Sequence, residues 1–166
     1  MLLALTGMAL SAYALYVESQ HEKYMSKEFK SLCDIPPMKI FGFELPNSSC
    51  SEVFAHPAGK IWSYLGLIPK DSSLDQPNAL YGFIFYVVIA FTALMRKNII
   101  AAHVALFFGL FSVVLSVYLA YILAYVMHHF CILCVSTYVV NFSIFFVSLK
   151  RLRDLRRELK DKKKAK

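Results

Sequence analysis

The chain has 166 residues, of which 58% are hydrophobic, 15% aromatic and only 17% charged. This is roughly the length of one domain, but the composition is that of a small membrane protein rather than a soluble one. Intrinsic disorder requires low hydrophobicity and is excluded, and 6 Gly, 6 Pro and 4 Cys exclude collagen-like and disulfide-dense secreted chains.

Four apolar stretches without Asp, Glu, Lys or Arg are predicted to cross the membrane. A bilayer core needs about 20 helical residues, with about 17 as the practical minimum. The first stretch is marginal and would also fit a signal peptide, but it lacks the positively charged leader of one. We predict an all-α membrane protein, a four-transmembrane-helix bundle that forms a single domain over residues 1–166. The helices are expected at about 2–17, 79–95, 99–127 and 131–149.

The distribution of basic residues predicts the orientation of this bundle. Ten of the eighteen Lys and Arg lie in the tail 150–166 and two in the connection 96–98, whereas the connection 18–78 has six beside eight acidic residues. Because basic residues favour the cytosolic side, we expect both termini and the basic tail in the cytosol and a luminal cap at 18–78. The net charge of +7 then belongs to membrane flanks, so we expect membrane lipid and no nucleic acid as a partner.

Two further motifs favour the endoplasmic reticulum membrane. The chain closes with Lys163-Lys164-Ala165-Lys166, which resembles a dilysine retrieval signal, although a generic basic flank would look the same. The sequon Asn47-Ser48-Ser49 lies in the expected luminal connection and would allow glycosylation there.

Small residues recur at four-residue spacing in the third stretch, which predicts that this helix is the central packing element. Ser112 and Ser116 are expected to bond back to their own helix. In the long connection, Ile61, Leu65 and Ile68 repeat at helical spacing and predict a cap on the bundle mouth, whereas the patch 40–45 could be a strand or an interfacial anchor. The small residues are Ala101, Ala105, Gly109, Ser112, Ser116, Ala120 and Ala124.

The four cysteines, Cys33, Cys50, Cys131 and Cys134, are all expected on the luminal face, where disulfides persist. Cys131 and Cys134 open the fourth helix three positions apart, so their sulfurs can reach each other. Cys131, which we expect nearer water, should be the more easily ionised of the two. A second pair on a loop above the first is the arrangement needed for a thiol–disulfide relay, and electrons arriving in a bilayer need a lipid-soluble acceptor such as a quinone.

Other readings of the cysteines stay open. A zinc site is disfavoured because sixteen residues separate Cys33 from Cys50, and no metal is expected. Two inert structural disulfides, Cys33 with Cys50 and Cys131 with Cys134, are a stronger alternative to the relay than a zinc site is. A claudin-like four-span structural protein would explain the loop pair but not the pair on the fourth helix.

Six segments, in their order and membrane placement, resemble the vitamin K epoxide reductase family. The resemblance implies a four-helix bundle around a quinone pocket and a thiol-dependent oxidoreductase that reduces vitamin K 2,3-epoxide and vitamin K quinone to the hydroquinone. It implies no tightly bound cofactor, since the quinone is the substrate, and a luminal thioredoxin-like protein as electron donor. The segments are Leu32-Cys33-Asp34, Ser49-Cys50-Ser51 with Val53-Phe54, Gln76-Pro77-Asn78-Ala79, Tyr81-Gly82-Phe83-Ile84-Phe85-Tyr86, Ser116-Val117-Tyr118-Leu119-Ala120, and Phe130-Cys131-Ile132-Leu133-Cys134 with Thr137-Tyr138.

The resemblance also implies a role for each cysteine. Cys134 would face the substrate, and Cys131 would be its partner that exchanges with Cys50. Cys33 would pair with Cys50 in another redox state and receive the electrons. A bacterial-type relative with the same bundle oxidises protein thiols and passes the electrons to quinone; that direction is the alternative, because net flow follows the potentials of donor and acceptor.

For the substrate, the resemblance implies that Asn78 and Tyr138 hydrogen-bond its oxygens and that Phe54 and Phe85 wall its ring. From the residues alone, Asn78 would cap the second helix and Tyr138 would fill the core. Two departures from the family pattern concern the cap: the interval between the loop cysteines is longer than usual, and an expected tryptophan is missing, with Trp62 slightly later.

Overall fold

The computed structural model of the chain describes residues 1–24, 34, 38–40, 43–45, 48, 50, 53, 56–69, 72, 74–127 and 130–164. Most of them are helical, and two short strands, β1 (Met38–Ile40) and β2 (Phe43–Leu45), pair as an antiparallel hairpin with Met38 opposite Leu45. The patch 40–45 therefore includes a strand. The helices are α1 (Leu2–Tyr24), α3 (Ile61–Tyr64), α4 (Asn78–Leu94), α5 (Ile99–Tyr121) and α6 (Ile132–Lys164), with a 3-10 turn at Pro57–Gly59 and a π-helical turn at Ile122–Val126 that prolongs α5.

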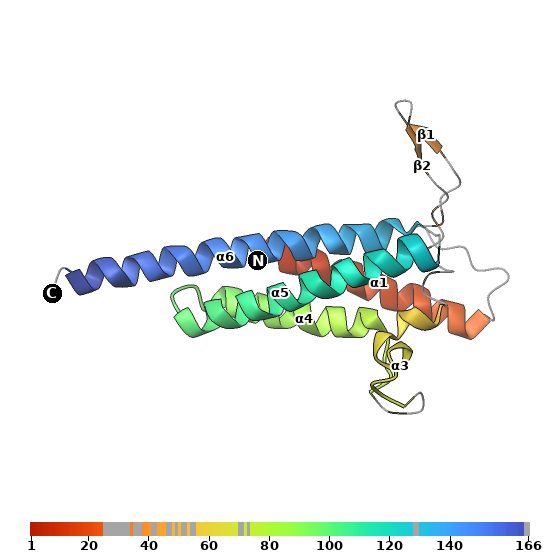
Figure 1. The fold of residues 1–166 in the computed structure, drawn as a ribbon, viewed down its shortest axis with the longest axis horizontal. Coiled ribbons are helices and arrows are strands. Elements are labelled where there is room, and N and C mark those ends of the chain that lie inside the picture. Colours follow the sequence, from red (N-terminus) through yellow and green to blue (C-terminus); the bar gives the residue numbers. More distant parts are fainter. Residues whose placement is uncertain are drawn as a thin grey trace.

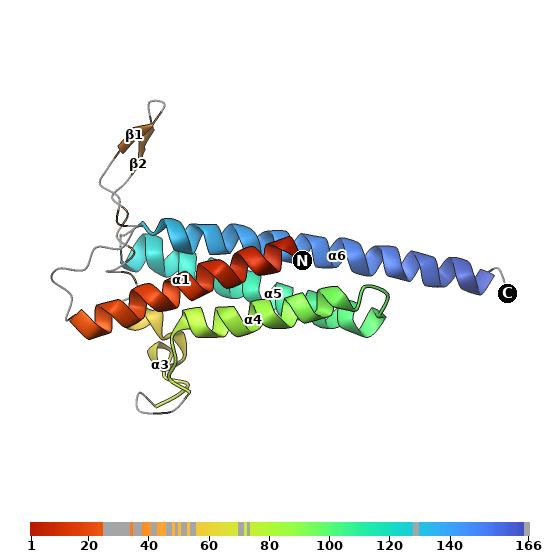
Figure 2. The same ribbon diagram turned by 180° about the vertical axis from the view of Figure 1, so that it is seen from behind.

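The four long helices lie side by side in an elongated bundle (Figure 1). Helix α1 packs against α4 and α6, and α5 packs against α6. The hairpin and α3 project from the end at which α6 begins, and the last turns of α6 run on beyond the other helices at the opposite end (Figure 2). The start of α6, where the Cys-x-x-Cys motif lies, is therefore at the same end as the long connection.

Three helical segments are long and apolar enough to cross a membrane by length and composition: Leu2–Gln20, Ile99–Val126 and Ile132–Lys164. Helix α4 is also apolar but has 17 residues. The outer faces of the helices carry exposed apolar side chains, such as Phe107, which is 68% exposed, and Val114, which is 61% exposed. A surface of this kind is typical of helices that face lipid rather than water.

Two helices are longer than predicted. Helix α1 was expected to end at residue 17 but continues to Tyr24, so Glu18 belongs to the helix and is buried. Helix α6 was expected to end at residue 149 but continues to Lys164, because the basic tail is rich in strong helix formers and contains no Gly or Pro. Arg151 ties this extension to the bundle by donating hydrogen bonds of 2.9 and 2.6 Å to the carbonyls of Thr92 and Met95 at the end of α4.

The predicted small-residue seam on α5 is confirmed for its first part, since the members from Ala101 to Ser116 are buried. Ala124 is exposed, so the seam does not reach the end of the helix. Ser112 donates 2.8 Å back to the Gly109 carbonyl as expected. Ser116 instead accepts a 2.9 Å hydrogen bond from Asn141 on α6, so its hydroxyl joins two helices.

The predicted helical repeat in the cap is only partly present. Ile61 is buried at 1% exposure, but Leu65 is 46% exposed. Helix α3 stops at Tyr64 because Gly66 adopts a φ of 69°, a left-handed conformation that ends helices and suits glycine. One turn of helix, rather than an extended amphipathic segment, lies against the bundle.

We predict that Gly7→Ala destabilises the protein whereas Gly109→Ala does not. A methyl group at Gly7 would overlap the buried ring of Tyr86, and overpacking costs about 1–3 kcal/mol. At Gly109 the nearest atom would be the Phe145 Cα at 3.4 Å, an ordinary contact. Both substitutions raise helix propensity by the same amount, so the difference between the thermal midpoints of the two variants in detergent measures the cost of the overlap with Tyr86. Equal midpoints would contradict the packing of α1 on α4.

Candidate active site

A cavity of about 420 Å³ lies inside the bundle at the end where the cap sits. All four long helices and the 58–62 segment contribute to its wall, which is mostly apolar. This volume and lining are typical of a site for a small, largely apolar molecule. The polar, sulfur-bearing and Trp/Tyr side chains of the wall belong to Ser11, Glu18, Trp62, Asn78, Tyr81, Tyr86, Ser112, Ser116, Met127, Cys134, Thr137, Tyr138 and Asn141.

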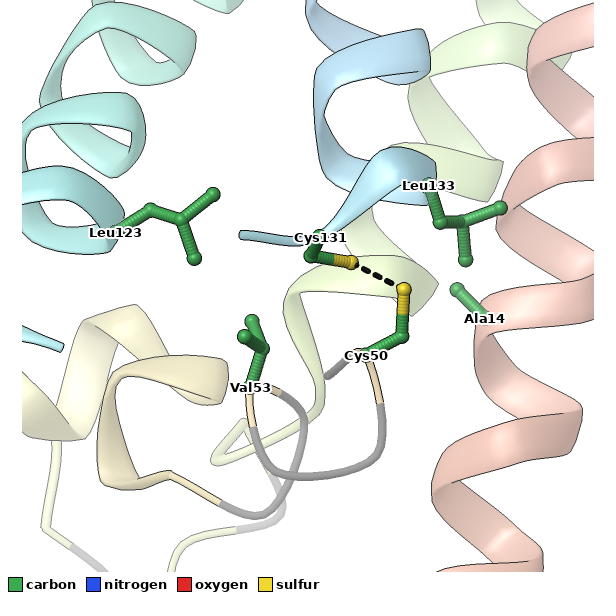
Figure 3. Packing of buried hydrophobic residues seen from close by; sticks show 6 residues of the cluster. All are labelled: Ala14, Cys50, Val53, Leu123, Cys131 and Leu133. Carbon is green, nitrogen blue, oxygen red and sulfur yellow. Dashed lines mark hydrogen bonds between the residues drawn. The ribbon is translucent and has the colours of Figure 1, made fainter. Parts of the chain in front are cut away.

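The cysteines lie at the end of this cavity nearest the cap. Cys134 is in its wall and is partly exposed, whereas Cys131 and Cys50 are fully buried beside it. The sulfurs of Cys131 and Cys50 are 2.7 Å apart and point toward each other, among Val53, Leu133 and other apolar side chains (Figure 3). A small shift would bring them to the S–S bond length of about 2.05 Å. Cys33 lies outside the described residues.

The segment that carries Cys50 is docked on the first turn of α6. Ser48 forms an isolated parallel bridge with Phe130, and its hydroxyl accepts a 3.4 Å hydrogen bond from the Ile132 amide. The same hydroxyl lies 3.9 Å from the Cys50 sulfur. The docking uses an amide that the start of a helix leaves unpaired, so it fixes Cys50 over Cys131 without breaking any helical hydrogen bond.

Burial corrects our expectation about ionisation. Cys131 was expected to be nearer water than Cys134, but its side chain is 0% exposed and Cys134 is the more accessible of the two. The pKa of the Cys50 thiol is also raised well above its ordinary value, first by its hydrogen bond with Cys131 and then by burial. Both sulfurs of the contact therefore favour the thiol over the thiolate while they are buried together.

The side chain of Asn78 ties the cap to the bundle. Its Oδ1 accepts a 3.0 Å hydrogen bond from the Ile61 amide, and its Nδ2 donates 2.8 Å to the Ala58 carbonyl. Asn78 is the first residue of α4, whose N-cap is Pro77, so the alternative that Asn78 caps its own helix is wrong. One N–H of the amide remains available, and the residue is in the cavity wall.

The other predicted binding residues are placed as follows. Tyr138 is in the cavity wall, and none of the described residues forms a hydrogen bond with its hydroxyl. Phe85 is also in the wall, with its ring centroid 5.0 Å from that of Tyr86. Phe54 lies outside the described residues.

Comparison with known proteins now adds to this geometry. The chain matches the family described as "Vitamin K epoxide reductase family" over residues 1–149. It belongs to the vitamin K epoxide reductase family. The resemblance of the six sequence segments is thereby confirmed, and the family match ends where the basic extension of α6 begins.

Two curated members of the vitamin K epoxide reductase family are similar over most of the chain. The vitamin K epoxide reductase complex subunit 1 of Rattus norvegicus is 31% identical over 151 residues, which are 90% of this chain and 86% of that protein. The protein of the same name from Mus musculus is 32% identical over the same shares.

Several residues of the cavity wall could not be recognised from the sequence pattern. Trp62 is in the cavity wall, and its ring stands at 74° to that of Tyr81 at a centroid distance of 6.0 Å. Tyr86 donates a hydrogen bond to Asn141, and Asn141 donates one to Ser116, so the three residues link three helices. A signal for Asn141 was available, because it follows Cys134 by seven residues and so lies on the same helix face.

We predict that Cys50 and Cys131 form a disulfide on mild oxidation when they are the only cysteines, in Cys33→Ser/Cys134→Ser. The matched control, Cys33→Ser/Cys131→Ser, keeps Cys50 and Cys134, which lies one turn deeper, and should cross-link much more slowly. Peptide mapping after alkylation measures both yields. Equal rates in the two variants would contradict the observed sulfur contact.

Proposed function

We propose that this protein reduces vitamin K 2,3-epoxide and vitamin K quinone to the hydroquinone, using electrons from dithiols. Family membership supports a thiol-dependent quinone and epoxide oxidoreductase. The observation that carries the proposal for this chain is the position of the two sulfurs of Cys131-x-x-Cys134: one opens onto an apolar cavity, and the other touches a cysteine of the cap.

The chemical step balances within the Cys131/Cys134 pair. The two thiols lose two electrons and two protons and become a disulfide. A quinone that gains them becomes the hydroquinone, and an epoxide that gains them becomes the quinone and releases water. Cys134 is the sulfur that approaches the substrate, because it is the one in the cavity wall.

The pair is then reduced again through the cap. Cys50 gives up its proton as the cap shifts and attacks the Cys131 sulfur as the thiolate, which forms the Cys50–Cys131 mixed disulfide and releases Cys134 as the thiolate, which takes up a proton. The 2.7 Å contact supports this choice of sulfur. Cys33 next displaces Cys131 from Cys50, and an external dithiol of the thioredoxin-like class reduces the resulting Cys33–Cys50 disulfide.

Asn78 and Tyr138 act as donors to the substrate oxygens. Asn78 has one free N–H and Tyr138 has a hydroxyl without a partner among the described residues. A donor aimed at the oxygen where negative charge develops stabilises the transition state in a site without water. Phe85, which is in the cavity wall, lies against the ring, and the family resemblance assigns the same role to Phe54.

The cavity also suits a ligand that enters from lipid. Its wall includes Ile84 on α4 and Phe111 on α5, and both are large apolar side chains with high exposed fractions, 52% and 49%. We propose that the cavity opens toward lipid between these two helices. A long apolar substituent can leave the cavity there and remain in the bilayer. The quinone is then the substrate, and the reaction needs no tightly bound cofactor.

This function requires a particular membrane arrangement. Helix α4 is the fourth span beside α1, α5 and α6, with both termini in the cytosol and the cap in the lumen of the endoplasmic reticulum. The basic extension of α6 and the connection 96–98 support the cytosolic side. The cysteines then meet the oxidising compartment and its dithiol proteins.

We predict that Cys134→Ala and Cys131→Ala abolish reduction of vitamin K epoxide even with a small dithiol reductant, because the reducing pair is destroyed. Cys33→Ala and Cys50→Ala should lose most activity with a protein donor and less with the small dithiol, which bypasses the cap. Hydroquinone formation by the purified protein is the measurement. Full activity of Cys134→Ala would falsify the proposed reaction.

We predict that a quinone quenches the emission of the protein in a saturable manner. Trp62 is the single tryptophan of the chain and is in the cavity wall, so the entire tryptophan signal reports on this site. Cys134→Ala serves as the control, since it should keep saturable quenching while losing turnover. Quenching that only grows linearly, as for free tryptophan in the same detergent, would show that the quinone does not enter the cavity.

A further inference from the structure

A second group of polar side chains lies deeper in the same cavity, where the proposed function assigns no role. The Tyr86 hydroxyl donates 2.8 Å to Oδ1 of Asn141, and Nδ2 of Asn141 donates 2.9 Å to the Ser116 hydroxyl. The three residues come from α4, α6 and α5, and all are in the cavity wall. Tyr86 and Ser116 are buried, at 2% and 3% exposure.

The hydrogens of this group outnumber the acceptors that face them. A tyrosine and a serine hydroxyl supply one hydrogen each, and an amide supplies two. Two of these four are used within the group, and the remaining hydroxyl hydrogen and amide hydrogen meet no acceptor among the described residues. Ser116 is buried, so its hydroxyl hydrogen is costly without an acceptor, and the half-buried Asn141 places a second free hydrogen beside it. A ligand in the cavity should therefore supply an acceptor oxygen at this point.

The neighbouring Ser112 shows that an unpaired hydroxyl hydrogen is not a general feature of the serines in the cavity wall. Ser112 is one turn away on α5, is also buried and is also in the cavity wall. Its hydroxyl is satisfied by the Gly109 carbonyl of its own helix. Ser116 has no such bond, and it serves as the acceptor of Asn141.

The depth of the group matches the size of a quinone ring. Asn141 follows Cys134 by seven residues, which is about 10 Å along α6 and returns to the same face. Contact of sulfur with a ring carbon takes about 3 Å, the ring to its far carbonyl oxygen about 4 Å, and a hydrogen bond about 3 Å. A ring in contact with Cys134 would therefore present its opposite oxygen to Asn141 and Ser116.

We infer that Ser116 and Asn141 form a second oxygen-binding site, which receives the ring oxygen opposite the carbon that faces Cys134. The Tyr86 hydroxyl occupies Oδ1 of Asn141 and so turns the amide N–H groups toward Ser116 and the cavity. The inference rests on the proposed function and adds a specificity to it: the site favours rings with oxygens at opposite positions over ring ketones with one oxygen.

The test compares two probes, 2-methyl-1,4-naphthoquinone and the single ketone 1-tetralone. Binding of the quinone is read from Trp62 emission, and binding of the ketone from its competition with the quinone. Asn141→Leu should raise the dissociation constant of the quinone about tenfold, and Ser116→Ala several-fold, while that of the ketone stays unchanged. The matched control, Ser112→Ala, should change neither.

An equal loss for both probes, or no change for either, would overturn the second oxygen site. Thermal midpoints in detergent show whether each variant is folded, and Ser116→Ala decides the question if Asn141→Leu does not fold. Reduction of vitamin K epoxide by the wild-type protein tests the proposed function separately. If the wild-type protein is active and the variants bind the quinone as it does, only the second site is wrong.

Discussion

The contact between the Cys50 and Cys131 sulfurs joins the long connection to the bundle, and the placement of the cap depends on it. Cys50 shares one apolar core with Ala14 of α1, Leu123 of the π-helical turn and Leu133 of α6. Removing this cysteine from its place would therefore open a core that three helices share. The residue that we propose for electron transfer is also a packing residue, so the cap must move, at least locally, whenever Cys50 exchanges its partner. Docking through Ser48 limits that movement to the neighbourhood of the α6 N-terminus.

Side chains from outside a helix satisfy some of its free backbone groups at both ends of the bundle. At the cap end Ser48 accepts from the first amide of α6, and at the other end Arg151 donates to the last carbonyls of α4. Asn98 is the exception, since it caps its own helix with bonds of 2.8 and 3.3 Å to Ile100 and Ala101. Such links across elements are needed because helix association in an apolar environment has little hydrophobic driving force. The same links bring the walls of the cavity together.

Much of the fold could be predicted from the sequence, because apolar length and small-residue spacing are local signals. The end of α6 could not be predicted. The first charged residue shows where a helix leaves an apolar environment, but it does not show where the helix itself ends. After Lys150 the helix continues because its residues favour helix, and Arg151 and the buried Leu152 hold its first turn against the bundle. The burial of Cys131 also escaped prediction, because it depends on a cap residue 81 positions away in the chain. Asn141 is the opposite case: its spacing from Cys134 is a local signal, but an isolated Asn in an apolar helix has no meaning until its partners on α4 and α5 are known.

The cavity has a direction, which follows from where its polar groups lie. Cys134 lies near the cap, the Tyr86–Asn141–Ser116 group lies about two helical turns farther from the cap, and most of the cavity wall is apolar. An apolar chain that ran past this polar group would bury its unpaired donors against hydrocarbon, which is unfavourable. A flat ring with oxygens at both edges avoids this cost, provided that its apolar substituent leaves sideways between Ile84 and Phe111. For the substrate that we propose, these polar groups and an exit between α4 and α5 would favour one orientation of the ring, with a ring carbon rather than the substituent in front of the Cys134 sulfur.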